Sequence, residues 1–154
     1  MTRFRQEAAL YESHQVELTR FATALVGPSD AADVVSEAVS SLLRSGKLEE
    51  ADRPEALMYR AVLAKARSHQ RSFYRRRARE RRFADELISH DPELRPDVVD
   101  AVMRLSPRQK ACVYLTYWED LSPSGVAERL GIGEGTVKGY LARARARLRE
   151  VLDE

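Results

Sequence analysis

Apolar residues recur every three or four positions along most of this chain, a spacing that places them on one face of a helix. Glycine and proline interrupt the pattern, and Ser or Asp precedes several of the periodic segments, where a helix cap is expected. No segment alternates between apolar and polar residues as a half-buried strand would. The pattern predicts an all-α chain with helices over residues 5–26, 29–44, from 54 into a basic run, 97–105, 107–119, 123–130 and from about 136 onward.

The second half of the chain contains the pattern of a helix-turn-helix. Ser122 and Pro123 can form the cap and first turn of a short helix, and Gly131 can end it in the left-handed conformation that glycine tolerates. We expect the small side chain of Ala127 where the two helices approach closely. Val137 would then lock the following helix onto the short one.

The last helix divides into an apolar stripe and a cationic face when it is laid out at 100° per residue. The stripe is expected to be core and comprises Val137, Leu141, Ala144, Leu148 and Val151. The opposite face carries small residues among cations, which suits insertion into the major groove of DNA. The candidate DNA-binding residues on this face and its flanks are Thr136, Lys138, Gly139, Tyr140, Ala142, Arg143, Arg145 and Arg147.

Within that set, Arg143 is the best candidate for a bidentate guanine contact, whereas Arg145 and Arg147 suit phosphate contacts. An ordinary amphipathic helix with solvated arginines would carry the same charges, and this alternative remains open.

Charge is segregated along the chain more than its total suggests. The 154 residues include 26 Lys plus Arg and 24 Asp plus Glu, a formal net charge of +2. Nine cations nevertheless fall between Lys65 and Arg82, opposed by Glu80 alone. Such a density is favoured when a polyanion neutralises it. Phe73 and Tyr74 lie inside this run, where they could stack on unpaired bases or be the last core contacts of their helix.

The basic run is followed by an acidic segment with two prolines, FADELISHDPELRPD, which is typical of a linker. We therefore predict two small helical domains, at residues 1–82 and 97–154, joined by residues 83–96. With 44% hydrophobic residues, the chain can form a modest core.

Several classes of function lack the residues they need. Cys112 is the single cysteine, so we expect no disulfide framework, and we expect the helix over residues 107–119 to bury it together with part of Trp118. The histidines at positions 14, 69 and 90 are expected to be isolated, so no metal site, cofactor site or catalytic constellation is predicted. His14 is expected to be a packed or boundary residue. Without a signal sequence or a long apolar segment, we expect a soluble cytoplasmic protein that is not an enzyme.

The segment LSPRQKACVYLTYWEDLSPSGVAERLGIGEGTVKGYLARARARLRE resembles the sigma-four signature of extracytoplasmic-function (ECF) sigma factors of bacterial RNA polymerase. The preceding helices, basic run and linker follow the order of that family, so the resemblance covers nearly the entire chain. It implies a sigma-two and a sigma-four domain, and an alternative sigma factor that directs core RNA polymerase to promoter DNA and initiates transcription. An anti-sigma factor is a further candidate partner.

The segment DAADVVSEAV resembles the family's polymerase-binding helix. The resemblance implies polymerase contacts by Asp33, Ser36, Glu37 and Ser40. It also implies contacts to the melted promoter element in and beside the basic run, for which the candidates are Lys65, His69, Gln70, Arg71, Phe73, Tyr74, Arg75, Arg76, Arg77 and Arg79.

The chain departs from the family pattern at positions that matter for function. Ser36 replaces a common glutamine, and Ala64 replaces an asparagine that reads a flipped promoter base. These departures favour one alternative, a diverged decoy that acts through protein contacts without initiating transcription. A helix-turn-helix regulator that binds DNA without polymerase is the other alternative. Gly139 and Tyr140 stand where Ser and Arg are common, which implies an altered sequence preference.

Overall fold

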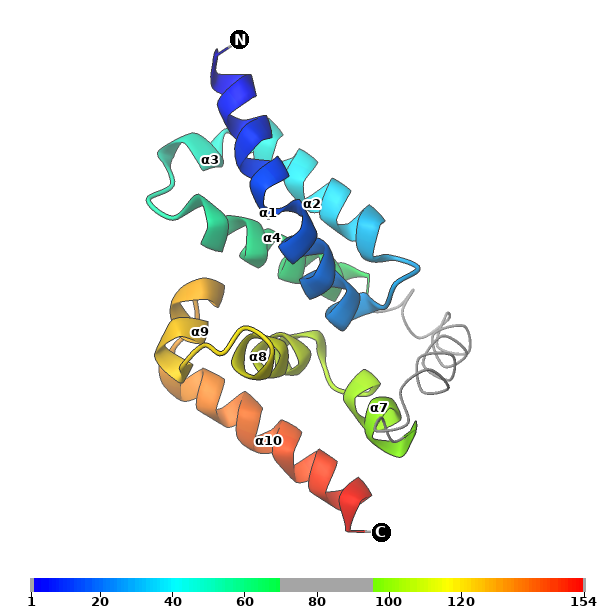
Figure 1. Ribbon diagram of the computed structural model, residues 1–154. Coiled ribbons are helices and arrows are strands. Elements are labelled where there is room, and N and C mark those ends of the chain that lie inside the picture. Colours follow the sequence, from blue (N-terminus) through cyan, green and yellow to red (C-terminus); the bar gives the residue numbers. More distant parts are fainter. Residues whose placement is uncertain (1, 70–95, 154) are drawn as a thin grey trace.

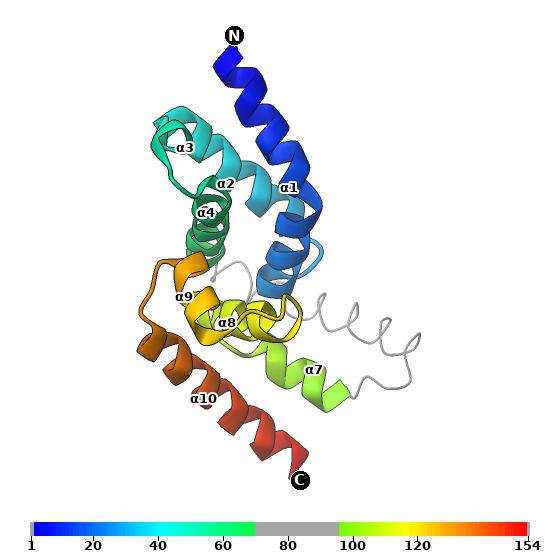
Figure 2. The same cartoon turned by 60° about the vertical axis from the view of Figure 1, so that its left-hand side comes forward.

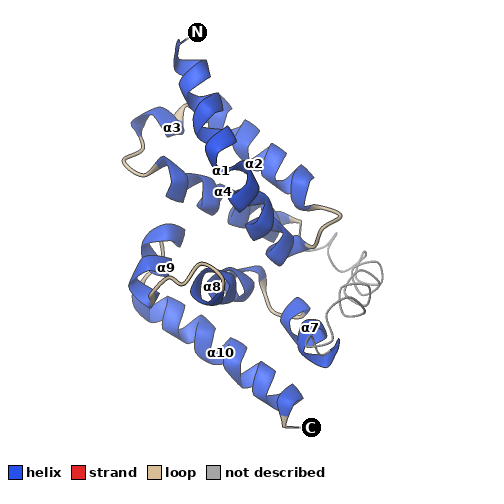
Figure 3. Cartoon of the chain, in the orientation of Figure 1, coloured by secondary structure: helices blue, strands red, loops and turns tan. Residues whose placement is uncertain are grey.

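In a computed structural model of the protein, residues 2–69 and 96–153 are described, and they form helices and loops without a strand (Figure 1 and Figure 3). In chain order the helices are α1 (Thr2–Val26), α2 (Ala31–Ser45), α3 (Lys47–Glu50), α4 (Pro54–Ser68), α7 (Pro96–Met103), α8 (Pro107–Tyr117), α9 (Pro123–Leu130) and α10 (Glu134–Leu152). The predicted all-α architecture with a C-terminal helix-turn-helix is confirmed. The predicted linker lies outside the described residues, apart from Pro96 at the start of α7.

Helices α1 to α4 make up a first helical unit, in which α1, α2 and α4 share a core. Leu18 and Phe21 of α1, Val34 of α2, and Met58 and Tyr59 of α4 are fully buried. The rings of Phe21 and Tyr59 lie 4.9 Å apart between centroids in a tilted arrangement that favours aromatic contact. None of the helices in the described ranges is long and apolar enough to cross a bilayer.

The two ends of α2 are formed in different ways. Gly46 ends the helix with φ 71°, the left-handed conformation expected of a C-terminal glycine. Asp30 occupies the N-cap position, but its side chain makes no cap hydrogen bond. The reason is its helical backbone, with φ −106° and ψ −11°, because capping requires an extended cap residue.

Helices α7 to α10 make up a second helical unit, in which α8 and α9 start at serine caps. Ser106 and Gln109 form a reciprocal capping box at α8, and the Ser122 hydroxyl accepts a hydrogen bond from the Gly125 backbone N–H at the start of α9. Gly131 then ends α9 with φ 68°. The expected cap, turn and second helix are thus all present.

Two local features differ from the sequence prediction. Helix α8 ends at Tyr117, so Trp118 lies beyond it and is 69% exposed, stacked on Tyr114 at 6.2 Å between centroids. The expectation that Trp118 is partly buried in the helix is therefore wrong. Short α3 was also not predicted, because four residues are too few for a helical period to appear.

The two units pack directly against each other through α8 and α9, which lie beside α1 and α4 (Figure 1 and Figure 2). The rings of Phe21 and Tyr114 lie 5.8 Å apart across this contact, and the buried core is continuous from one unit to the other. Lys110 of α8 is 2% exposed and donates a hydrogen bond from Nζ to the Leu25 carbonyl oxygen at 3.0 Å. This bond satisfies one of the free carbonyls at the C-terminal end of α1.

Candidate nucleic-acid interface

Helix α10 is fixed to the second unit by one buried face. Val137, Leu141 and Ala144 are at most 3% exposed and belong to the core that α10 shares with α8 and α9. Val151 and Leu148, farther along the same stripe, are only half-buried. The predicted stripe is therefore fully core over its first part and partly covered at its C-terminal end.

The candidate DNA-binding residues of α10 lie on the side opposite that stripe or along its borders, and Tyr140 packs against the core. Thr136, Lys138, Ala142, Arg143, Arg145 and Arg147 are exposed, and Gly139 and Tyr140 are half-exposed. Helix α10 occupies the far side of the second unit from the first, as both views show (Figure 1 and Figure 2). The first unit consequently leaves this outward face uncovered.

The arginines at the edges of the outward face are held by neighbouring helices. Arg145 donates from Nε to the Tyr117 hydroxyl at 3.0 Å, and Arg147 donates from Nη1 to the Arg104 carbonyl oxygen at 3.2 Å. These contacts direct both guanidinium groups along the borders of the face. Such positions suit the phosphates that flank a groove more than the base edges within it.

Arg143 differs from these two because it has no hydrogen-bond acceptor among the described residues. Its guanidinium carbon lies 5.9 Å from the centroid of the Tyr140 ring, within range of a weak cation–π contact. The Tyr140 hydroxyl in turn accepts a hydrogen bond from Arg108 Nη1 at 3.4 Å. Arg143 thus lies on an anchored aromatic ring with its donors free for a ligand.

Gly139 leaves an open space in the middle of the outward face. A Cβ atom built on it would meet no other atom within 4 Å. Packing within the protein therefore does not require glycine at this position, whereas a backbone that must approach a bulky ligand closely would favour it.

The predicted polymerase-binding residues lie together on one face of α2. Asp33, Ser36, Glu37 and Ser40 are all exposed, opposite the buried Val34, Val35 and Ala38. The helix thus presents this face to solvent.

Glu37 contacts two residues that were predicted to bind the melted promoter. Its Oε2 lies 3.2 Å from Lys65 Nζ and 3.4 Å from His69 Nε2, both on or just after α4. The hydrogen bond with Lys65, followed by that with His69, lowers the pKa of the Glu37 carboxyl. The structure therefore brings a predicted polymerase contact and two predicted DNA contacts to one place. The other candidates for the melted promoter lie outside the described residues: Gln70, Arg71, Phe73, Tyr74, Arg75, Arg76, Arg77 and Arg79.

Comparison with known proteins establishes the family. Residues 96–148 match the family described as Sigma-70, region 4. The ECF RNA polymerase sigma factor SigL of Mycobacterium tuberculosis is 34% identical over 162 residues, a match that covers 95% of this chain and 88% of SigL. The chain belongs to the ECF sigma factors.

Two further relatives define how far this ECF sigma factor resembles known ones. The RNA polymerase sigma-E factor of Streptomyces antibioticus is 46% identical over 56 residues, or 36% of this chain, and the match spans 31% of that relative. The sigma factor RpoE of Bartonella quintana, solved in complex with the anti-sigma factor NepR, is 24% identical with a TM-score of 0.59. That likeness covers 99% of this chain and 98% of RpoE, and it shows a shared fold.

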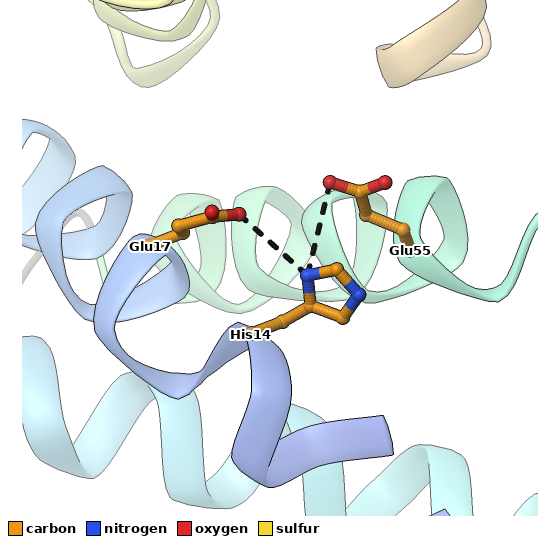
Figure 4. Close-up of side chains that lie close together, drawn as sticks. All are labelled: His14, Glu17 and Glu55. Atoms are coloured by element: carbon orange, nitrogen blue, oxygen red, sulfur yellow. Dashed lines mark ion pairs between the residues drawn. The ribbon is translucent and has the colours of Figure 1, made fainter.

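One cluster in this sigma factor was not predicted from its sequence. His14 and Glu17 of α1 and Glu55 of α4 point toward one another (Figure 4). The expectation that the histidines are isolated is therefore wrong for His14, as it is for His69. The spacing of His14 and Glu17 is visible in the sequence, but only the packing of α4 on α1 brings Glu55 beside them.

Cys112 behaves as the sequence predicts. The residue is fully buried in α8, and this burial raises the pKa of its thiol to about 11. A thiol that stays protonated near neutral pH is a poor nucleophile, so Cys112 serves packing.

Proposed function

We propose that this ECF sigma factor acts in the cytoplasm as an alternative sigma factor, without catalytic activity of its own. It directs core RNA polymerase to specific promoters and initiates transcription there. The observation that carries the proposal is the outward face of α10. Its cations and open Gly139 face solvent, while the opposite stripe fixes the helix to a helix-turn-helix.

In this proposal, α10 enters the major groove of the upstream promoter element. Arg143 contacts guanine, because its donors are free and a guanidinium can bond O6 and N7 together. Arg145 and Arg147 contact phosphates on either border, which orients the helix without selecting a sequence.

The first unit supplies the second contact. The exposed α2 face with Asp33, Ser36, Glu37 and Ser40 docks on polymerase, and Lys65 and His69 face the melted strand together with the basic run that follows. The pairing of Glu37 with Lys65 and His69 supports a close spatial relation between these surfaces. An anti-sigma factor as a further partner stays a prediction from the sequence.

Transcription in vitro with purified core polymerase tests the proposal. A library of duplexes, each with a randomised upstream element and a transcribed barcode that identifies it, is transcribed by core polymerase with and without the protein, and the barcodes in the transcripts are sequenced. We expect products from a defined subset of sequences only when both proteins are present. The variant Arg143→Ala should lose or change that subset, whereas Arg5→Ala, which removes an exposed cation far from α10, should not.

Two outcomes contradict the proposal. Protection of specific DNA by the protein alone, without transcripts, would favour a polymerase-independent regulator. Inhibition of core polymerase without any promoter-specific product would favour a decoy.

A further inference from the structure

The cluster of His14, Glu17 and Glu55 lies away from α10, where the first unit faces α9 of the second. His14 Nδ1 is 3.6 Å from Glu17 Oε2 and 3.8 Å from Glu55 Oε1 (Figure 4). One ligand atom of each residue lies within 4.8 Å of the other two. Two helices thus direct an imidazole nitrogen and two carboxylates at one point.

The spacing of these atoms is too long for hydrogen bonds. An N–H···O bond spans about 2.7–3.2 Å, and His14 Nδ1 is a buried atom without a hydrogen-bond partner. If Nδ1 carries a lone pair, three acceptors converge, and the cation that contacts them among the described residues is Arg129, whose Nη1 lies 3.6 Å from Glu55 Oε1. A tetrahedral metal ion with bonds of about 2.0–2.2 Å would hold its ligand atoms roughly 3.3–3.6 Å apart. The distances from His14 Nδ1 to the two carboxylate oxygens, 3.6 and 3.8 Å, are close to this range.

We propose that His14, Glu17 and Glu55 bind one divalent transition-metal ion of the Zn²⁺ class. An imidazole with two carboxylates is a donor set that Zn²⁺ and Co²⁺ accept, whereas Mg²⁺ and Ca²⁺ prefer oxygen ligands alone. A cavity of about 440 Å³ borders His14 and Glu55 and leaves room for a water molecule as a fourth ligand.

Arg129 of α9 links this site to the contact between the units. Its Nη1 lies 3.6 Å from Glu55 Oε1, the same oxygen that faces His14, and its guanidinium carbon lies 4.7 Å from the Tyr59 ring centroid. A divalent ion on Glu55 would share that carboxylate with the guanidinium and repel it. Metal binding and the Arg129 contact therefore oppose each other, and metal occupancy would weaken the hold of α9 on α4.

Metal titration of the full chain tests the site without reference to transcription. Metal-depleted protein is titrated with Co²⁺, monitored by visible absorption, and with Zn²⁺, monitored by calorimetry. We expect one ion per chain and a Co²⁺ spectrum typical of tetrahedral coordination. His14→Ala and Glu55→Gln should each weaken binding on the order of 100-fold or more, at least as much as loss of an outer-shell partner.

His69→Asn is the matched control, because His69 also lies beside a carboxylate, Glu37, but contacts no second one within residues 2–69 and 96–153. Its affinity should equal that of the unaltered chain. Circular dichroism confirms that each variant keeps its helices. Absence of stoichiometric binding, or equal affinity in His14→Ala, would overturn the site.

Arg129→Gln tests the competition between the guanidinium and the ion. We expect this variant to bind Zn²⁺ several-fold more tightly, because Glu55 loses its competing cation. Equal or weaker binding in Arg129→Gln would overturn the link to the contact between the units.

Discussion

Three arginines on α10 have different local contacts, and these contacts predict different roles. Arg145 and Arg147 are held at the borders of the outward face by Tyr117 and the Arg104 carbonyl, whereas Arg143 lies on the Tyr140 ring with its donors free. A guanidinium that must rotate to meet a base edge benefits from a weak contact such as that between Arg143 and the Tyr140 ring. One that only neutralises phosphate can be held in advance.

Arg143→Ala should cost roughly 1–3 kcal/mol of promoter binding and relax the preference at one base pair. Arg145→Ala should weaken binding to all sequences alike and reduce the slope of log K against log salt by about 1. Binding assays of the polymerase complex over promoter variants at two salt concentrations separate these effects. Equal loss on every sequence for Arg143→Ala would contradict its assigned contact with guanine.

A second prediction at the residue scale concerns the carboxyl of Glu37. Lys65 and His69 lower its pKa, so Lys65→Met should move that pKa up toward the ordinary value of 4.5. The pKa of Glu37 is lower in the folded protein than its ordinary value, so its contact with Lys65 and His69 stabilises the fold at pH values above that ordinary value. This stabilisation is lost as the pH falls through the lowered pKa of the folded protein. NMR titration of the Glu37 side-chain carbon measures the change. Lys138→Met is the control, since Lys138 pairs with Glu134 instead, and an unchanged Glu37 titration in Lys65→Met would contradict the contact.

At the scale of single elements, two glycines of the helix-turn-helix serve opposite purposes. Gly131 has φ 68°, and a Cβ there would come within 2.6 Å of Arg60 Nε, whose side chain also donates to the Glu128 carbonyl oxygen. Gly139 lies inside α10, where a Cβ would meet nothing. The first glycine is required by the fold, and the second is not.

Gly131→Ala should therefore lower the free energy of unfolding by about 1–2 kcal/mol, because of its left-handed backbone and the crowding at Arg60. Gly139→Ala should raise it by roughly 0.5–1 kcal/mol, because alanine favours a helix interior. Chemical denaturation followed by circular dichroism measures both.

The affinity for promoter DNA should fall in Gly139→Ala even though the fold becomes more stable. If α10 enters a groove, the added methyl group faces the DNA and prevents close approach. A variant that gains stability and keeps full promoter binding would argue against close approach at this position.

Most of the elements follow from local rules that the sequence displays. Apolar spacing and the caps at Ser106, Ser122 and Gly131 define the helices and the turn. The errors have physical causes: α3 is too short to show a period, and Trp118 lies one residue beyond the end of α8. Contacts between distant helices leave no local pattern, so Glu55 beside His14 and Lys110 beneath Leu25 could not be predicted.

At the scale of the whole molecule, a buried lysine joins the two units. Lys110 Nζ donates to the Leu25 carbonyl oxygen at 3.0 Å, and the Phe21 and Tyr114 rings also meet across this contact, within one continuous core. Elsewhere in the contact between the units, Arg53 pairs with Glu128 at 2.8 Å, and both side chains are exposed. Exposed pairs contribute little, so the buried contacts hold the units together.

Lys110→Ala should weaken the packing of the units by about 1–3 kcal/mol, because the Leu25 carbonyl loses a charged donor. Hydrogen–deuterium exchange measures this loss as roughly 5- to 150-fold faster exchange in α8, α9 and the end of α1. Exchange in α2 should change much less. Lys138→Ala, which removes an exposed lysine, serves as the control, and uniform acceleration throughout the chain would indicate global destabilisation instead.

The shared core also determines which apolar surface the chain exposes while it is being synthesised. On the ribosome, α1 to α4 emerge before α8 and α9 exist, so the apolar surface around Phe21 that α8 covers is exposed to the cytosol for several seconds at about 5–20 residues per second. During that interval the nascent chain exposes an apolar surface to which a chaperone can bind. A product that ends before α8 would keep that surface exposed permanently.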